Sequence, residues 1–248
     1  MMAVLLGGLP VLGQESVCVP GDGDWVRKVC FENVKSAPAY GHEVLGKTPE
    51  WDEMSVFYGP EGQGKADGQQ IGSTVFQTNH VFEDIAPRLV DIDGDGRLEA
   101  VVVQSNFSKG ARLAIYKFKP EPKLLAATPY IGTSYRWLAP VGVADFNGDG
   151  DMDVAYVDRP HLAKTLRVWT YRNGSLSEIA NLRGVTNHKI GEAFITSYIR
   201  TCNGRAEMIL TDGARKNIVS IFFEQDRLNS RVLGRFSDRK SVDPPPAC

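Results

Sequence analysis

The sequence predicts an all-β fold assembled from a repeated unit of short strands. An acidic segment at residues 91–99 recurs at residues 145–153, so the two copies begin 54 residues apart. Both copies lie between short apolar runs of the kind that form buried strands. We expect prolines and glycines to fall between these runs rather than inside them. A repeat of this length is typical of one propeller blade, so the sequence predicts a small β-propeller of four-stranded antiparallel blades.

Two repeats are clear, near residues 85–135 and 139–190, and each predicts four strands. The first repeat contains the apolar runs Ala86–Val90, Ala100–Val103, Leu113–Phe118 and Lys123–Ala127. The second contains Ala139–Ala144, Val154–Val157, Leu166–Tyr171 and Leu176–Ala180. In both repeats the acidic segment separates the first strand from the second.

A third repeat, near residues 193–235, keeps the strands but not the acidic segment. Thr201–Glu207 aligns with residues 91–99 once the central Asp-Gly pair is deleted, and it precedes the predicted strands Glu207–Thr211 and Ile218–Phe223. We therefore predict a blade that kept its fold and lost its ion. A fainter repeat, near residues 40–80, includes Met54–Tyr58 and Ser73–Gln77.

The remaining apolar runs decide the predicted blade count. Trp25–Phe31 and Ser230–Phe236 lie near the two ends of the chain, and we expect them to form a closing blade together. This gives five blades, with four or six as alternatives, in one domain over residues 20–248.

Composition and charge exclude several classes of protein. The chain has 248 residues with 42% hydrophobic residues, which suits one folded domain, and its formal net charge is −2. Scattered basic residues and a near-neutral charge argue against a nucleic-acid partner. After residue 13 no apolar run is long enough for a transmembrane helix.

The first residues and the cysteines indicate export. Met1–Gly13 is an apolar run of signal-peptide length, and we expect residues 1–19 to be an export segment and leader, although an apolar first strand is an alternative. The protein would then be periplasmic or extracellular. There, Cys18 could pair with Cys30, and Cys202 with Cys248; four separate buried thiols are the other interpretation.

Each acidic segment has the composition of a calcium loop. Oxygen-bearing side chains stand at positions one, three, five and nine, and glycines allow the sharp turn. The predicted ligands are Asp91, Asp93, Asp95 and Glu99 with the main-chain carbonyl of Arg97, and Asp145, Asn147, Asp149 and Asp153 with the carbonyl of Asp151. An EF-hand needs an acidic residue at position twelve, where Val102 and Tyr156 stand instead. We expect two structural Ca²⁺ ions; ordinary Asp/Gly turns are the alternative.

The Ala-Pro lead-in, the acidic loop and the following strand resemble the FG-GAP or VCBS repeat of integrin-α-type β-propellers. The resemblance covers residues 86–118 and 139–171, and it extends to small secreted bacterial proteins with this repeat. It implies four-stranded blades around an axis, with calcium between the first two strands of a blade, on the lower face. The leading Phe-Gly of the repeat is absent here.

The connections on the opposite face carry a second group of candidates. Thr-Asn-His occurs at residues 78–80 and 186–188, which are two repeats apart. Hydrogen bonding between adjacent blades explains this recurrence more simply than ligand binding does. Loops on a rigid scaffold are common binding sites. The candidate ligand-binding residues there are Arg136, Trp137, Asp158, Arg159, His161 and His188, although Trp137 could equally be a core residue.

The resulting hypothesis is a calcium-binding exported propeller that binds a protein or a glycan. The first alternative is a hydrolase or lyase that uses His161 and His188 with Asp158 or Glu192. The second is a purely structural module. The sequence contains no nucleophile-elbow, zinc-protease or phosphate-loop motif, so an enzyme rests on fold analogy alone.

Overall fold

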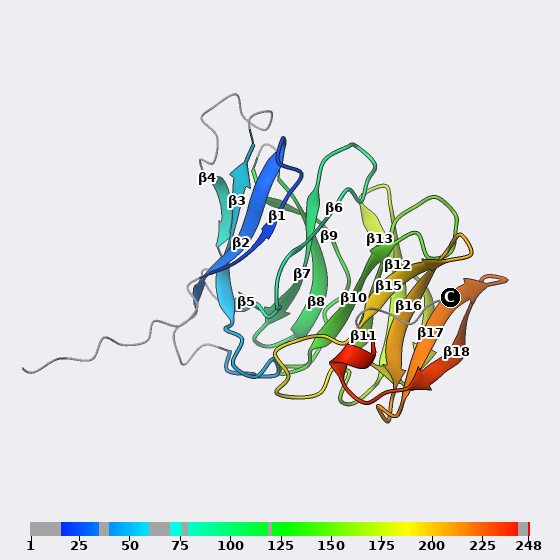
Figure 1. Cartoon of the computed structure of the whole chain (residues 1–248). Helices are drawn as coiled ribbons and strands as arrows, with labels where there is room; N and C mark the ends of the chain where they lie inside the picture. The colour runs from blue at the N-terminus through cyan, green and yellow to red at the C-terminus, as the bar shows by residue number, and fades with distance from the viewer. Residues whose placement is uncertain (1–15, 35–39, 60–69, 76–78, 119–120, 243–247) are drawn as a thin grey trace, which may run out of the picture.

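The computed structural model describes residues 16–34, 40–59, 70–75, 79–118, 121–242 and 248, and the statements below concern these residues. Within them the fold is all-β, with one short 3₁₀ turn at Arg239–Ser241, and every pairing between strands is antiparallel. The strands form four blades in a row (Figure 1).

Blades 1 and 2 make one continuous sheet. Blade 1 consists of β1 (Ser16–Pro20), β2 (Val26–Val34), β3 (Trp51–Tyr58) and β4 (Gln70–Val75). Blade 2 consists of β5 (His80–Phe82), β6 (Arg88–Val90), β7 (Glu99–Asn106), β8 (Gly110–Lys117) and β9 (Lys123–Ala127). The short strands β5 and β6 pair with opposite ends of β7, and a single pairing of Trp51 with Phe82 joins the two blades.

Blades 3 and 4 are separate sheets. Blade 3 consists of β10 (Leu138–Ala144), β11 (Asp153–Asp158), β12 (Thr165–Arg172) and β13 (Ser175–Arg183). Blade 4 consists of β14 (Val185–Thr186), β15 (Tyr198–Cys202), β16 (Arg205–Asp212), β17 (Asn217–Glu224) and β18 (Arg227–Arg235). As in blade 2, two short strands share one neighbour, because β14 and β15 both pair with β16.

The hydrophobic core lies between the blades. Alternate residues of each central strand point to opposite faces of the blade and pack against different neighbouring blades. In β7, Ala100 and Val102 pack toward blade 1, whereas Val101 and Val103 pack toward blade 3. In β11 the alternate residues likewise pack toward blades 2 and 4. A strand covered on both faces needs a continuous apolar run, which is why these strands do not alternate with polar residues.

Two expectations about the chain ends are wrong, and the blade count is one of the two alternatives to the preferred count. The described strands form four blades rather than the preferred five. Ser230–Phe236 falls largely in β18, which pairs with β17, and Trp25–Phe31 falls largely in β2, which pairs with β1 and β3, so the two runs do not share a closing blade. Residues 16–19 belong to β1 rather than to a leader, while residues 1–15 lie outside the described part.

Loops join blades 1 and 4 in place of a shared strand. The amide of Gly191, in the loop after β14, donates to the carbonyl of Val44, in the loop after β2, at 3.1 Å. Gly46 has a positive φ of 63°, and a Cβ there would lie 2.4 Å from the carbonyl oxygen of Gly191. The close approach of the two loops therefore requires glycine at position 46.

Other predicted strands are present, with two local differences. Of the run Ser73–Gln77, β4 includes residues 73–75 and residues 76–77 lie outside the described part. Pro140 lies inside β10, not between strands, and the register of β10 against β11 shifts between Pro140 and Gly142. A β-bulge tolerates a residue that cannot donate to the ladder, which explains the exception.

The cysteines form two disulfides, Cys18–Cys30 across β1 and β2 and Cys202–Cys248. The interpretation as paired cysteines is confirmed, and disulfides indicate an oxidising, exported environment. Among the described residues, no helix has the length and apolar character needed to cross a membrane.

Candidate functional site

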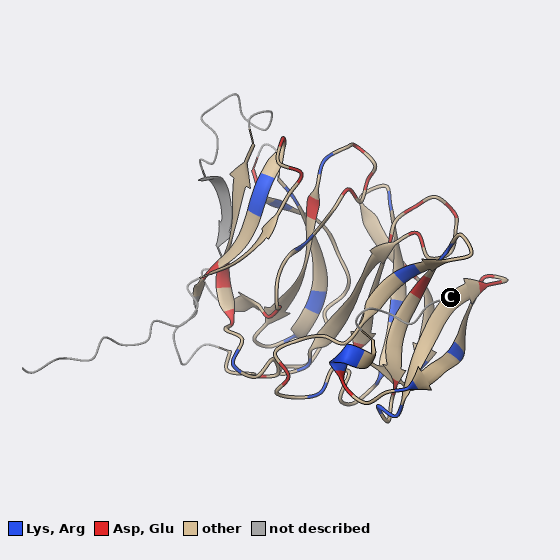
Figure 2. Cartoon of the chain, viewed as in Figure 1, with Lys and Arg blue, Asp and Glu red and all other residues tan. Residues whose placement is uncertain are grey.

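The two acidic loops and the second group of candidates lie at opposite ends of the blades. The second acidic loop leads into β11 at Asp153, and the link after β11 starts at Arg159. In Figure 2 the red acidic segments of the two loops lie at the upper edge of the blades, and the links after β7 and β11 run along the lower edge. We call these edges the loop face and the pocket face.

The first acidic loop folds its carboxylates inward. Asp91 accepts from the amide of Gly96 at 2.9 Å, and Glu99, which is 1% exposed, accepts from the amide of Ile92 at 3.1 Å. Oxygen atoms of Asp91, Asp93 and Glu99 lie within 4.8 Å of one another. Burial raises the pKa of Glu99 to about 7; the charges of Asp93 and Asp95 add to this shift, whereas the hydrogen bond from the Ile92 amide and the charge of Lys117 oppose it.

One atom of this loop has no partner. The Oδ1 atom of Asp91 is buried and accepts no hydrogen bond, although buried polar atoms normally have a partner. An oxygen-ligated cation placed among Asp91, Asp93 and Glu99 would supply one. The donor set therefore fits a hard divalent cation.

The second loop repeats the hydrogen-bond pattern of the first, although both carboxylate oxygens of Asp145 accept hydrogen bonds. Asp145 accepts from the amides of Gly148 at 2.7 Å and Gly150 at 3.0 Å. Asp153 is fully buried, accepts from the amide of Phe146 at 3.0 Å and from the hydroxyl of Thr170, and its pKa is raised, chiefly by burial. The two loops also line a common depression of about 460 Å³, which Tyr171 and Arg172 share.

A basic side chain from the third strand reaches each loop. Lys117 Nζ, at the end of β8, lies 3.1 Å from Asp93 and 3.0 Å from Asp95. Arg172, at the end of β12, contacts Asp149 and Asp151. The predicted ligand Asp95 accepts hydrogen bonds from Lys117 and from the amide of Arg97. Arg97 was itself predicted to contribute its main-chain carbonyl as a ligand.

Blade 4 has an acid at the equivalent place with different partners. Glu207 pairs with Arg200 across β15 and β16, as Glu99 pairs with Val90 and Asp153 with Ala144 in the other blades. It is fully buried, and Arg200, Arg205 and Arg231 donate to it, at 2.7 to 3.3 Å. Burial opposes ionisation, but hydrogen bonds from Ser220 and the arginines prevail and lower the pKa of Glu207 to about 2.

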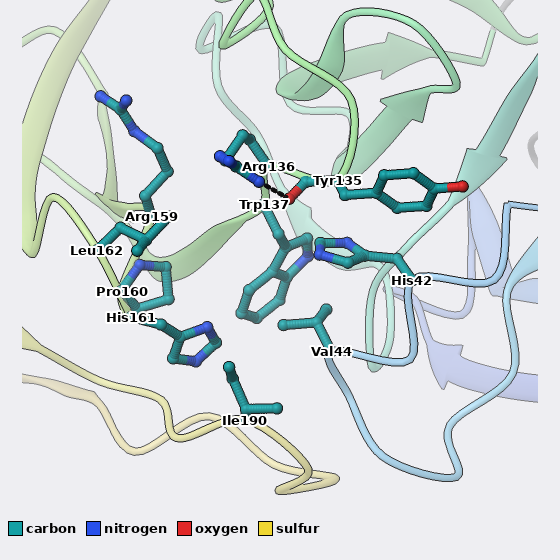
Figure 3. Close-up of a pocket in the computed structure, with 10 residues that line it drawn as sticks. All are labelled: His42, Val44, Tyr135, Arg136, Trp137, Arg159, Pro160, His161, Leu162 and Ile190. Carbon is teal, nitrogen blue, oxygen red and sulfur yellow. Dashed lines mark hydrogen bonds between the residues drawn. The ribbon is translucent and has the colours of Figure 1, made fainter.

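On the pocket face, loops from all four blades enclose a cavity of about 360 Å³ (Figure 3). We call it the rim pocket. Its lining residues are His42, Val44, Tyr135, Arg136, Trp137, Arg159, Pro160, His161, Leu162 and Ile190. Four of the six predicted ligand-binding residues line it: Arg136, Trp137, Arg159 and His161.

The other two predicted residues lie behind the lining. His188 is 1% exposed, contacts the ring of Trp137 edge-on at a centroid distance of 4.9 Å and lies 2.9 Å from His161. Asp158 is 4% exposed and accepts from Arg159 and Arg167. Both therefore hold lining residues in place.

Trp137 combines the two roles that the sequence left open. Its side chain is 2% exposed and belongs to the core between blades 2 and 3, and its Nε1 donates to the carbonyl of Glu83 at 2.8 Å. The ring nevertheless forms part of the pocket wall (Figure 3). It is a rigid floor rather than an exposed contact.

Sequence reasoning missed an aromatic and acid–base group from blade 1. His42 Nδ1 lies 2.6 Å from a carboxylate oxygen of Glu83, which is 3% exposed, and burial raises the pKa of Glu83. Tyr40 stacks on Tyr135 at a centroid distance of 5.0 Å and also on Phe107. The faint repeat near residue 40 carried no motif that could have placed these residues beside residue 135.

Two residues of the pocket wall have left-handed backbone conformations. Tyr135 has φ = 54° and Arg159 has φ = 45°. Side chains other than glycine adopt this region at a cost of about 1–2 kcal/mol. The hydrogen bond from the Tyr135 amide to the Tyr40 hydroxyl at 2.7 Å helps to hold the first of them. Such conformations are concentrated at binding and catalytic sites.

The Thr-Asn-His segment serves the fold, as the simpler interpretation predicts. Asn187 Nδ2 donates to the carbonyls of Ala139 at 3.2 Å and Pro140 at 3.1 Å, joining blade 4 to blade 3. His80 lies near Tyr130, with 3.0 Å between its Nε2 and the hydroxyl, and does not line the rim pocket. Thr78 lies outside the described residues.

Comparisons with known proteins agree with the repeat. A family profile described as an FG-GAP-like repeat matches residues 91–156, which include both acidic loops. No sequence among curated proteins matches this chain. Among solved structures, the chain is similar to the exotype rhamnogalacturonan lyase YesX, with a TM-score of 0.46 and 14% identity.

That similarity covers 94% of this chain and 50% of the lyase, so this chain spans about half the length of that protein. The family match, the acidic loops and the antiparallel blades lead to one conclusion. The chain contains an FG-GAP-like repeat within an all-β, propeller-type fold.

Proposed function

We propose that this protein is an exported, calcium-stabilised binding module that holds a protein or glycan partner in the rim pocket. The observation that carries the proposal is the concentration of exposed apolar side chains around one cavity. Among the described residues, six large apolar side chains are exposed, and three of them, Tyr135, Leu162 and Ile190, line the rim pocket. Exposed apolar patches on a soluble domain commonly mark binding surfaces.

The composition of the wall supports the same function. Tyr and Arg are enriched in binding hot spots, and Tyr135 and Arg136 line the pocket. The wall also has little freedom to rearrange, because Trp137 is anchored in the core and Tyr135 is stacked on Tyr40. A preorganised wall loses little entropy when a partner binds.

The acidic loops on the other face would supply stability. We infer one Ca²⁺ in each loop, held by the predicted carboxylates. In the first loop the buried, unpartnered oxygen of Asp91 supports this inference, and the second loop has the same spacing of oxygen ligands. The ion would join the first two strands of its blade, far from the rim pocket. Its role in this proposal is structural.

An enzyme is the second candidate, and one pair of residues favours it. His42 lines the rim pocket and its Nδ1 faces the buried Glu83, the arrangement by which a carboxylate orients a general base. The carboxylates first expected in this role are occupied elsewhere, since Asp158 binds arginines and Glu192 binds Arg215 at 2.9 Å. Hydrolysis or β-elimination dependent on His42, and absent from His42→Gln, would establish this candidate.

Binding can be tested with probe sets of both partner classes. Labelled protein is applied to a glycan array and to an array of random 15-residue peptides. Leu162→Asp and Ile190→Asp place charge at the mouth of the pocket and should remove the signal. Val232→Asp is a matched control, because Val232 is 64% exposed against 65% for each of the other two and lies on β18. Signals that survive both pocket substitutions would contradict the proposal.

A further inference from the structure

A second depression adjoins the rim pocket. It has a volume of about 530 Å³ and is lined by Arg159, Ala163, Thr165, Arg167, Asn181 and Arg183. Arg159 lines both depressions, so the link at residues 159–164 forms a wall between them. We call the second depression the arginine basin.

Strand register builds the basin on one face of blade 3. Thr165 pairs with Arg183 and Arg167 pairs with Asn181, across β12 and β13. Residues two apart on a strand point to the same face, so these four side chains are adjacent. The three arginines and the hydrogen-bonding Thr and Asn therefore face one opening.

The basin has more positive charge than its neighbours neutralise. Asp158 accepts from both Arg159 and Arg167, and the remaining acid, Glu178, pairs only with Arg167. Within the described part of the chain, no carboxylate lies within ion-pair distance of Arg183. On the rim-pocket side, Arg136 donates to the main-chain carbonyl of Tyr135 rather than to a carboxylate.

We propose, resting on the binding function above, that the partner is a protein segment with a large apolar side chain next to acidic residues. The apolar side chain would fill the rim pocket, between Leu162 and Ile190. The carboxylates would lie on the arginine basin and on Arg136, because guanidinium groups bind carboxylates in a bidentate manner. Aliphatic Leu and Ile at the mouth favour an apolar protein side chain over a sugar ring.

The probe is a set of fluorescein-labelled 12-residue peptides. Each peptide has one Phe, followed by a Glu-Glu pair at a spacing of one to five residues, and each has a twin with Gln-Gln. Binding is measured by fluorescence anisotropy at 50 and 200 mM NaCl. We expect at least one Glu peptide to bind about tenfold more tightly than its Gln twin, with the difference shrinking at the higher salt concentration.

Variants separate the two parts of the site. Arg183→Glu should weaken the Glu peptide about tenfold and leave its Gln twin unchanged, whereas Leu162→Asp should weaken both. Arg227→Glu is the control, since Arg227 is an exposed arginine at the start of β18 on the loop face. Thermal melts establish that each variant is folded.

The outcomes distinguish this inference from the function on which it rests. Equal binding of Glu and Gln peptides, with both lost in Leu162→Asp, would overturn the acidic partner and leave the rim pocket as a binding site. Absence of peptide binding together with a pocket-dependent signal on the glycan array would overturn the protein partner. Binding that neither Leu162→Asp nor Arg183→Glu reduces would overturn both.

Discussion

The Nε2 atom of His161 lies 2.9 Å from the Nδ1 atom of His188, whose own Nε2 lies 2.8 Å from the main-chain oxygen of Glu192. A carbonyl oxygen only accepts, so Nε2 of His188 carries a proton and its Nδ1 accepts from His161 when both rings are neutral. Nδ1 of His161 then remains an acceptor on a side chain that lines the rim pocket. Burial lowers the pKa of both histidines, that of His161 to about 4.

This pair predicts a loss of stability below neutral pH. The unfolded chain takes up protons near pH 6.5, whereas folded His161 resists protonation until about pH 4, so the free energy of unfolding should fall as the pH drops through this window. Urea unfolding at pH 7.5, 6.5 and 5.5 measures it. His161→Phe should have a smaller pH slope than the native protein, and an unchanged slope would contradict the assignment.

The acidic loops predict a calcium-dependent melting temperature. A ligand that binds only the folded state raises the melting temperature, and the stabilisation grows with the logarithm of the ligand concentration over the dissociation constant. We expect a rise between EDTA and millimolar calcium, reduced in Asp91→Asn and in Asp145→Asn and absent in the double variant. Asp226→Asn, in the turn between β17 and β18, is the control. A full calcium-dependent rise of the melting temperature in the double variant would contradict the assignment of both calcium sites.

Lys117 should contribute more to thermal stability in the absence of calcium than in its presence. Its Nζ contacts Asp93 and Asp95 and neutralises part of the loop charge, and these contacts raise its own pKa. Lys117→Met should lower the melting temperature more in EDTA than in calcium, and should tighten calcium binding because no ammonium group competes. Calorimetric titration and melts of the same variant test both effects. An equal loss in both buffers would mean that Lys117 only packs.

Among the acidic residues of blade 4, we expect substitution of Glu207 to lower the free energy of unfolding most. Removing one partner of a buried ion pair typically costs about 3–5 kcal/mol, and Glu207→Gln would remove the carboxylate to which the buried Arg200 donates. Equilibrium urea unfolding measures the loss. Glu224→Gln, at the exposed end of β17, should change the free energy of unfolding by less than about 0.5 kcal/mol. The effect of Glu207→Gln should be the same in EDTA and in calcium.

Local patterns predicted the strands and the connections, because burial between two blades demands apolar runs such as Ala100–Val103. They also grouped Arg136, Trp137, Arg159 and His161, since the repeat places their connections on one face. They could not place His42 or Ile190 in the same pocket, because contacts between blades 1 and 4 involve residues about 150 positions apart. Nor did they reveal the arginine basin, which depends on the register of β12 against β13.

The missed blade closure has the same cause. Apolar runs near both ends suggested shared strands, but each run already had a neighbour in its own hairpin. Pairing between β1 and β2 is local and is reinforced by the Cys18–Cys30 disulfide. Local pairing costs less chain entropy than pairing across the whole chain.

The hydrogen bond between Gly191 and Val44 lies where the first and last blades meet, beside the rim pocket. Among the described residues no strand pairing joins blade 1 to blade 4, and the loops that meet there, which bear Val44 and Ile190, also form the wall of the pocket. A molecule seated in the pocket therefore touches both ends of the row of blades. When the chain termini are pulled apart, we expect such a molecule to hold blades 1 and 4 together and so to raise the force at which the blades separate.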